Sequence, residues 1–157
     1  MQAAGENHMG LWAAMQANAT LTIHSAGWLE GGLSFGYEKF INDVEGLQQL
    51  AELCTATPQD TPSLGWDALK DVDPGGHFFA TQHTMDRYRD AFYEPLVADL
   101  SNHGAWVDAG AKTATERATD IWQQVLHDYT PPTSAQGVAD RLAAYVETRT
   151  KAGGAAP

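Results

Sequence analysis

Hydrophobic side chains recur every three or four positions along much of the chain, which is the spacing of amphipathic helices. The clearest run predicts a helix over residues 37–54, with Ser34 as its N-cap and Cys54 as a small buried residue. Its apolar positions are Tyr37, Phe40, Ile41, Val44, Leu47, Leu50, Ala51 and Cys54. Similar but weaker patterns predict helices over residues 6–18, 63–71, 84–100, 111–129 and 134–151.

A different pattern occupies residues 20–25, Thr-Leu-Thr-Ile-His-Ser, where β-branched residues predict a strand. It is the best strand in the sequence and almost the only one. The predicted class is therefore α/β and predominantly helical, with a strand-bearing first third followed by a run of helices. Because one strand cannot form a sheet, we expect further strands to precede this sequence.

Composition and charge exclude several classes of partner. The 157 residues are 43% hydrophobic and 18% charged, and 9 basic against 20 acidic residues give a net charge of −11. Such a polyanion gains little from phosphates, so we expect neither nucleic acid nor an anionic membrane surface as a partner. The stretch between Glu6 and Glu30 has no charged residue, but polar residues interrupt it and no basic residue precedes it. We therefore predict a cytoplasmic protein with no leader or membrane span.

A glycine-rich loop follows the predicted strand, and residues just beyond a strand's carboxyl end often form ligand sites in α/β proteins. In it, Glu30 could bind a cation or move a proton, and Trp28 could form an aromatic wall for a quaternary ammonium group. The neighbouring glycines would let backbone amides approach a substrate. The alternatives remain open: Glu30 as a solvated loop carboxylate, Trp28 as a core residue, and His24 as a satisfied interior histidine.

A second loop spans residues 75–84 and contains His77 and His83. The two histidines are six positions apart, and no Asp, Glu or Cys completes an obvious zinc triad. Helix capping and packing against Phe78 and Phe79 explain them more simply, so we predict no directly bound metal. A zinc hydrolase using both histidines is the weaker alternative.

Taken in order, these loops resemble the C-terminal part of the trimethylamine:corrinoid methyltransferase family. The resemblance runs from about residue 2 to about residue 142. It rests on Ser-Ala-Gly-Trp-Leu-Glu-Gly-Gly-Leu at 25–33, Ser-Phe-Gly-Tyr-Glu-Lys-Phe at 34–40, Asp-Pro-Gly-Gly-His-Phe at 73–78, and the helix after His83. Gln-Ala-Ala-Gly-Glu at 2–6 resembles the motif near which amine-specific members carry pyrrolysine. Gly5 at that place indicates a betaine-type member without pyrrolysine.

The resemblance implies the end of a TIM-type (β/α)₈ barrel with a helical C-terminal extension. Residues 1–82 would form the last βα segments, residues 83–151 the extension, and residues 152–157 a frayed tail. The implied reaction moves a methyl group from a tertiary or quaternary amine, such as trimethylamine or a betaine, to a corrinoid carried by a partner protein. We expect the 157-residue chain to be inactive by itself, because the earlier barrel strands are absent.

The site residues implied by the resemblance and the loop chemistry fall into two groups. The predicted catalytic residues are Glu30 and His77. The predicted substrate-binding residues are His24, Trp28, Gly31, Gly32 and Tyr37.

A non-catalytic helical assembly module derived from the same family is the alternative function. In that case Trp106, Trp122 and Tyr145 would lie in an interface. Either reading predicts an oligomer or a partner chain that completes the barrel.

Overall fold

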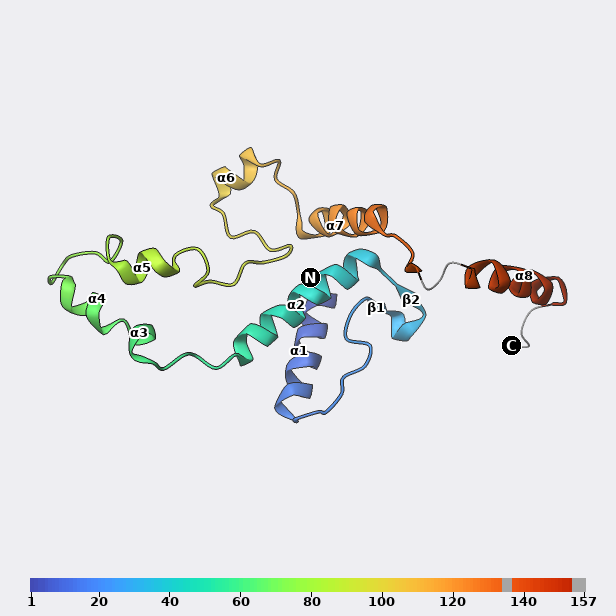
Figure 1. Ribbon diagram of the computed structural model, residues 1–157, viewed down its shortest axis with the longest axis horizontal. Coiled ribbons are helices and arrows are strands. Elements are labelled where there is room, and N and C mark those ends of the chain that lie inside the picture. Colours follow the sequence, from blue (N-terminus) through green and yellow to red (C-terminus); the bar gives the residue numbers. More distant parts are fainter. Residues whose placement is uncertain (134–136, 154–157) are drawn as a thin grey trace. The chain divides into compact units, whose positions relative to one another are not determined.

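The computed structural model describes residues 1–133 and 137–153, and helices predominate in them (Figure 1). The chain divides into two compact units, Met1–Trp122 and Gln123–Pro157. The elements are α1 (Gln2–Gln16), β1 (Trp28–Leu29), η1 (Glu30–Gly32), β2 (Ser34–Phe35), α2 (Tyr37–Cys54), α3 (Thr61–Leu64), α4 (Trp66–Asp71), α5 (Gln82–Arg87), α6 (His103–Asp108), α7 (Ala114–Asp128) and α8 (Val138–Lys151). The predicted domain boundary between residues 82 and 83 stays a prediction.

The strand predicted over residues 20–25 is wrong. These residues form irregular backbone, and the side chains of Leu21 and Ile23 are 78% and 65% exposed. A strand needs a hydrogen-bonded neighbour, and within the described ranges only β1 and β2 pair with each other. They form a two-stranded antiparallel hairpin in which Trp28 faces Phe35 and Leu29 faces Ser34. The sheet component is therefore this short hairpin.

The helix predicted over residues 37–54 is confirmed as α2, although both details at its ends are wrong. Ser34 belongs to β2, and the N-cap position is held by Gly36 in extended backbone. Cys54 is exposed, because the last turn of α2 has no element packed over it in the described chain. The middle of α2 contacts α1, where the His8 ring lies close over Gly46. A side chain at position 46 would collide with that ring.

The apolar core of the first unit joins α2, the segment around Val97, and α7. Ile41, Val97 and Ala118 are buried together, with Ala114, Ile121 and Trp122 packed against them. The helix predicted over residues 84–100 ends at Arg87, so that prediction is wrong beyond its first turns. Pro95 explains why no helix continues through residues 94 and 95, since proline disfavours helical backbone in the preceding residue and lacks an N–H, whereas α5 already ends well before it. The irregular chain after Pro95 brings Val97 into the core.

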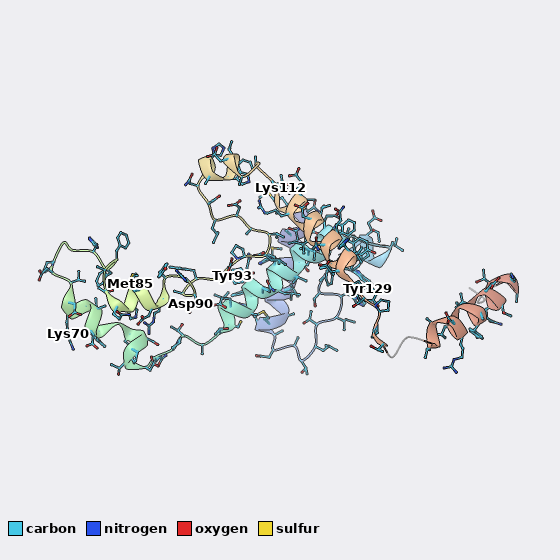
Figure 2. The ribbon with its side chains drawn as sticks, turned by 45° about the horizontal axis from the view of Figure 1, so that its top comes forward. Lys70, Met85, Asp90, Tyr93, Lys112 and Tyr129 are labelled. Atoms are coloured by element: carbon cyan, nitrogen blue, oxygen red, sulfur yellow. The ribbon has the colours of Figure 1, made fainter. Side chains whose placement is uncertain are left out.

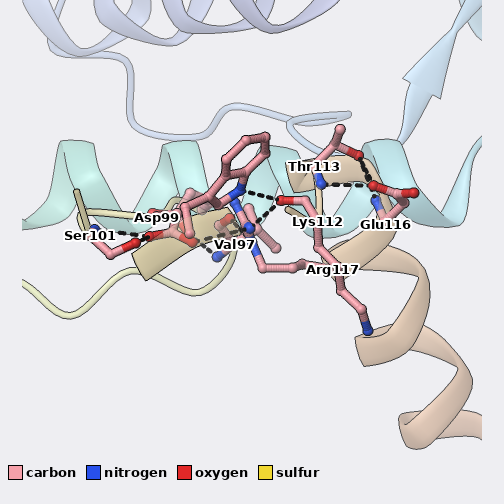
Figure 3. A network of polar contacts seen from close by, with 9 residues as sticks. Val97, Asp99, Ser101, Lys112, Thr113, Glu116 and Arg117 are labelled. Carbon is pink, nitrogen blue, oxygen red and sulfur yellow. Dashed lines mark hydrogen bonds and ion pairs between the residues drawn. The ribbon is translucent and has the colours of Figure 1, made fainter. Parts of the chain in front are cut away.

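Polar contacts hold the Val97 segment against the start of α7 (Figure 3). The Arg117 guanidinium donates from Nε to the Val97 carbonyl at 2.6 Å, and its Nη1 donates to the Lys112 carbonyl. The Trp106 indole donates to the same Lys112 carbonyl at 3.0 Å. Glu116 accepts from the Thr113 N–H at 2.7 Å while its own N–H donates to the Thr113 hydroxyl at 3.3 Å. This reciprocal pair is a capping box, and it explains why α7 begins after Thr113.

Two other predicted segments differ in detail. The helix over residues 63–71 is split into α3 and α4 by Gly65, whose φ is +66°. The break predicted over residues 102–110 contains the short helix α6, capped by Asn102, whose side chain accepts from the Ala105 N–H at 3.1 Å. Asparagine is a preferred N-cap, and that signal is present in the sequence.

The described part of the second unit contains α8, which begins later than predicted. Residues 134–136 of the predicted helix and residues 154–157 of the predicted tail lie outside the described residues. The apolar face predicted for α8 is exposed throughout: Val138, Leu142, Tyr145 and Val146. Across the described ranges, every helix is too short or too polar to cross a membrane.

Candidate functional site

A hollow of about 290 Å³ lies beside the β1–β2 hairpin. It is lined from α1 by Ala3, Glu6 and Asn7, from the hairpin region by His24, Trp28, Leu29, Glu30 and Gly31, and from α2 by Lys39. The structure thus brings together four of the seven predicted site residues: His24, Trp28, Glu30 and Gly31. Its volume is at the lower end of the range of about 300–1,000 Å³ for small-molecule sites.

Left-handed backbone shapes the loop that carries these residues. His24 has φ +58° and Glu30 has φ +52°, both uncommon for residues with a Cβ. Gly32 has φ +93°, and a Cβ there would lie 2.1 Å from the Trp28 ring. Gly27 is covered in the same way by the ring of Phe35. Glycine at positions 27 and 32 is therefore explained by two aromatic rings that pack against the backbone.

The Trp28 side chain is held on two sides and still reaches the surface. Its ring centroid lies 3.9 Å from that of His24, with an angle of 34° between the planes, and the indole also covers Gly32. The residue is 43% exposed. His24 and Gly32 take up these two sides of the ring, and the exposed remainder of the indole is a fixed aromatic part of the wall of the hollow.

The charges around the hollow are mainly negative. Glu6 accepts a hydrogen bond from the Gln2 amide at 2.8 Å, and within the described chain neither Glu6 nor Glu30 forms an ion pair. The Lys39 ammonium is paired with the Asp43 carboxylate, which balances its charge. Two carboxylates are thus left to attract a cation.

The other three predicted site residues do not line this hollow. Gly32 lies under the Trp28 indole, and Tyr37 stacks on Trp122 with a centroid distance of 5.0 Å. The ring of His77 lies 5.3 Å from that of Phe79. Their predicted roles are not tested by this arrangement and stay predictions.

The second loop has no recognisable metal centre. His83 packs near Gly65, and its Nε2 is buried without a hydrogen-bond partner. In the part of the chain that the structure describes, no three His, Cys, Asp or Glu side chains are grouped to hold an ion. The zinc hydrolase alternative therefore gains no support.

Sequence reasoning missed two buried carboxylates on α2. Asp43 is 3% exposed and accepts from the Gly27 N–H at 2.8 Å and from Lys39. Glu45 is 5% exposed and accepts from the Val97 N–H at 2.6 Å. Tyr93, which is labelled in Figure 2, donates to Glu45 at 3.2 Å. The i, i+4 spacing of Lys39 and Asp43 was visible in the sequence. The burial of Asp43 and Glu45 was not visible, because the hydrophobic pattern placed these two carboxylates beside the apolar face of the helix.

Two of the aromatic residues predicted for an interface make contacts within the chain, and their place in an interface stays a prediction. Trp122 stacks on Tyr37, and its indole donates to Glu38 at 2.8 Å. Its neighbour Thr119 donates to the same carboxylate at 3.1 Å. Together with the backbone N–H of Glu38, which has the largest effect, these bonds lower the pKa of Glu38. Trp106 donates to Lys112, as described above, and Tyr145 is exposed on α8.

Comparisons with known proteins agree on one family. The family model described as trimethylamine methyltransferase (MTTB) matches residues 1–154. The chain is 33% identical over 150 residues to a glycine betaine methyltransferase of Desulfitobacterium hafniense strain Y51, which covers 96% of this chain and 31% of that protein. It is 31% identical over 125 residues to a trimethylamine methyltransferase of D. hafniense strain DSM 10664 / DCB-2, covering 80% of this chain and 25% of the relative. A trimethylamine methyltransferase of Methanosarcina mazei is 27% identical over 123 residues, covering 78% of this chain and 25% of the relative. The chain therefore spans a third or less of the length of these relatives.

Proposed function

Because this chain belongs to the trimethylamine methyltransferase family, we propose that it contributes the amine-binding hollow of an enzyme that demethylates a tertiary or quaternary amine. The relatives are named for trimethylamine and for glycine betaine, which supports a substrate of this class. The observation that carries the proposal is the meeting of Trp28, Glu30 and Glu6 around one hollow.

The chemistry of the substrate explains why these residues suit it. A quaternary ammonium has no N–H and cannot donate a conventional hydrogen bond, so it is recognised by aromatic faces and by nearby negative charge. Trp28 offers an aromatic wall, and Glu30 and Glu6 offer the charge. The net charge of −11 also attracts a cation over longer distances.

In the proposed reaction, a carbon–nitrogen bond breaks, nitrogen keeps the electron pair, and the methyl group passes to an external nucleophile. A corrinoid carried by a partner protein would supply that nucleophile, so no residue of this chain is assigned to hold it. The role of this chain is to orient one methyl group outward and to limit water around the cation. Glu30 stabilises the positive nitrogen before the transfer, and Gly31 leaves room beside it. A catalytic role for His77 belongs to the same proposal.

We place the hollow in a TIM-type barrel, with residues 1–82 as its last βα segments and residues 83–151 as a helical extension. On this proposal turnover requires the whole barrel. Gly5 lies on α1 between Ala3 and Glu6, which both line the hollow, and a Cβ on Gly5 would meet nothing within 4 Å. The proposal of a betaine-type member rests on the glycine itself, at the place near which amine-specific members carry pyrrolysine.

A chimera tests the proposal. This chain replaces the matching segment of the D. hafniense glycine betaine methyltransferase, and methyl transfer from glycine betaine and trimethylamine to a corrinoid protein is measured. We expect turnover with one of these amines and about a five-fold loss of kcat/KM in E30Q, since a partly exposed charge pair contributes up to about 1 kcal/mol. The matched control is E52Q, an exposed carboxylate on α2 away from the hollow. A folded chimera that binds no methylated amine would contradict the proposal.

The alternative, a non-catalytic assembly module, is favoured by one observation. The apolar face of α8 is exposed, with Leu142, Tyr145 and Val146 each more than half exposed. An uncovered face of this kind is typical of an interaction surface. Light scattering after size exclusion distinguishes the outcomes. A compact monomer with a cooperative melting transition would count against this alternative.

A further inference from the structure

The hairpin that carries Trp28 and Glu30 is too small to hold its own shape. Its strands are two residues long, and an isolated two-stranded hairpin is at best marginally stable in water. His24 and Glu30 also have left-handed backbone, which persists only where surrounding contacts enforce it. Something outside the hairpin must therefore fix it.

Phe35 packs on Tyr37 and Phe40 of α2, and α2 also supplies a polar anchor. The Gly27 N–H donates to Oδ2 of Asp43 at 2.8 Å, across sixteen positions of sequence. For residues 24–35, it is the one hydrogen bond to a side chain of another element in the described part of the chain. The Gly27 carbonyl accepts from the Gly36 N–H at 3.2 Å, so the anchored residue also closes the base of the hairpin.

Asp43 connects this anchor to the opposite wall of the hollow. It is 3% exposed, and the same Oδ2 accepts from the Lys39 ammonium. Lys39 itself lines the hollow. A buried carboxylate is costly unless its charge is paired and hydrogen-bonded; Lys39 pairs the charge of Asp43, and Lys39 and Gly27 both donate to its Oδ2. The carboxylate is thus fixed by Lys39 and in turn fixes the loop.

We propose that Asp43 is a positioning residue of the amine site, which holds the Gly27 amide so that Trp28 and Glu30 face the hollow. The role in substrate binding rests on the function proposed above, while the anchor itself does not. A hydrogen bond to a charged acceptor is roughly twice as strong as one between neutral groups, so the charge of Asp43 matters as well as its shape. The D43N variant should therefore hold the loop less well than the unmodified chain, and the D43A variant should not hold it.

Hydrogen exchange of the Gly27 amide, measured by NMR on the full chain, tests the anchor. We expect protection to fall about five- to ten-fold in D43N and about 10- to 100-fold in D43A. The matched control is D67N, because Asp67 pairs with Lys70 in the same way but is exposed on α4. K39M removes the ammonium that fixes the carboxylate, so protection of the Gly27 amide should also fall in K39M, but by less than in D43A. Protection that is equal in D43A and D67N would overturn the proposal.

A second measurement needs no variant and covers the case in which D43A does not fold. In the unmodified, isotope-labelled chain, a through-hydrogen-bond coupling should connect the Gly27 nitrogen with the Asp43 carboxyl carbon. Its absence would overturn the anchor.

Titration with tetramethylammonium separates the anchor from the proposed function. We expect binding in the unmodified chain and in D67N, and weaker binding in D43N, followed through the Trp28 indole resonance. Equal affinity in D43N and the unmodified chain would overturn the positioning role. No binding in the unmodified chain, together with an intact Gly27 anchor, would instead contradict the function proposed for the hollow.

Discussion

Replacing Glu45 with glutamine should destabilise the first unit, because this buried carboxylate joins α2 to the segment that carries Val97. Oε2 accepts from the Val97 N–H at 2.6 Å, and Oε1 accepts from the Gln49 amide at 2.9 Å and from the Tyr93 hydroxyl at 3.2 Å. Glutamine keeps only one acceptor oxygen. The side-chain amide of glutamine therefore points an N–H toward one of the groups that donate to Glu45.

The expected magnitude follows from those contacts. A hydrogen bond to a charged group contributes about 1.5–3 kcal/mol, so losing one charged bond at this 5% exposed site should cost about 2 kcal/mol. For a chain of this length that corresponds to about 4–8 °C in Tm. E52Q makes the same chemical change at an exposed position of α2 and should cost less than about 0.5 kcal/mol.

The stabilisation of the folded state by Glu45 should be present at neutral pH and lost in acid. Burial raises the pKa of Glu45, but the hydrogen bonds, led by that from Val97, outweigh it and leave the pKa below its ordinary value of 4.5. A carboxyl whose pKa is lowered by folding stabilises the folded state above its unfolded pKa, and this contribution is lost as pH falls through the folded value. The difference in Tm between the unmodified chain and E45Q should thus be full at pH 7 and should shrink below about pH 4.5.

Thermal unfolding followed by circular dichroism at pH 7 and in acid measures both effects. If E45Q and E52Q melted together at pH 7, Glu45 would not be joining these segments. A difference that stayed constant into acid would show that the charge of Glu45 is not responsible.

Three further outcomes follow from individual contacts. V97A should lower the free energy of unfolding by about 2 kcal/mol, because Val97 is 2% exposed in the core, and urea unfolding against V125A, an exposed control, measures this. G32A should displace the Trp28 ring and weaken tetramethylammonium binding, whereas G75A, which has a similar positive φ and open space around it, should leave binding unchanged in the same NMR titration. W122F removes the indole N–H that donates to Glu38, so the pKa of Glu38 should rise toward its ordinary value, and an NMR pH titration that found no rise would refute that contact.

The parts of the fold that the sequence predicted are those governed by local periodicity. The helix from Tyr37 to Cys54 was found because eight apolar positions repeat along one face. The gathering of His24, Trp28, Glu30 and Gly31 was also expected, since they share one short glycine-rich loop. Nearness in sequence made these predictions possible.

The errors arise where distant residues decide the conformation. Leu21 and Ile23 have strand propensity, but propensity cannot supply the hydrogen-bonded neighbour that a strand needs. The burial of Asp43 depends on the Gly27 amide, which lies sixteen residues away. By contrast, Asn102 and the Thr113–Glu116 pair were local signals, and weighing them would have placed the starts of α6 and α7.

The central claim is that the hollow beside Trp28 and Glu30 recognises a methylated ammonium by its charge. NMR titration of the isotope-labelled chain tests it most directly, with choline compared with 3,3-dimethylbutan-1-ol, in which a neutral carbon replaces the charged nitrogen. We predict a saturable shift of the Trp28 indole resonance with the cation only, weakened in E30Q and unchanged in E52Q. Equal responses to the charged and uncharged ligands, or no response to either, would contradict the claim.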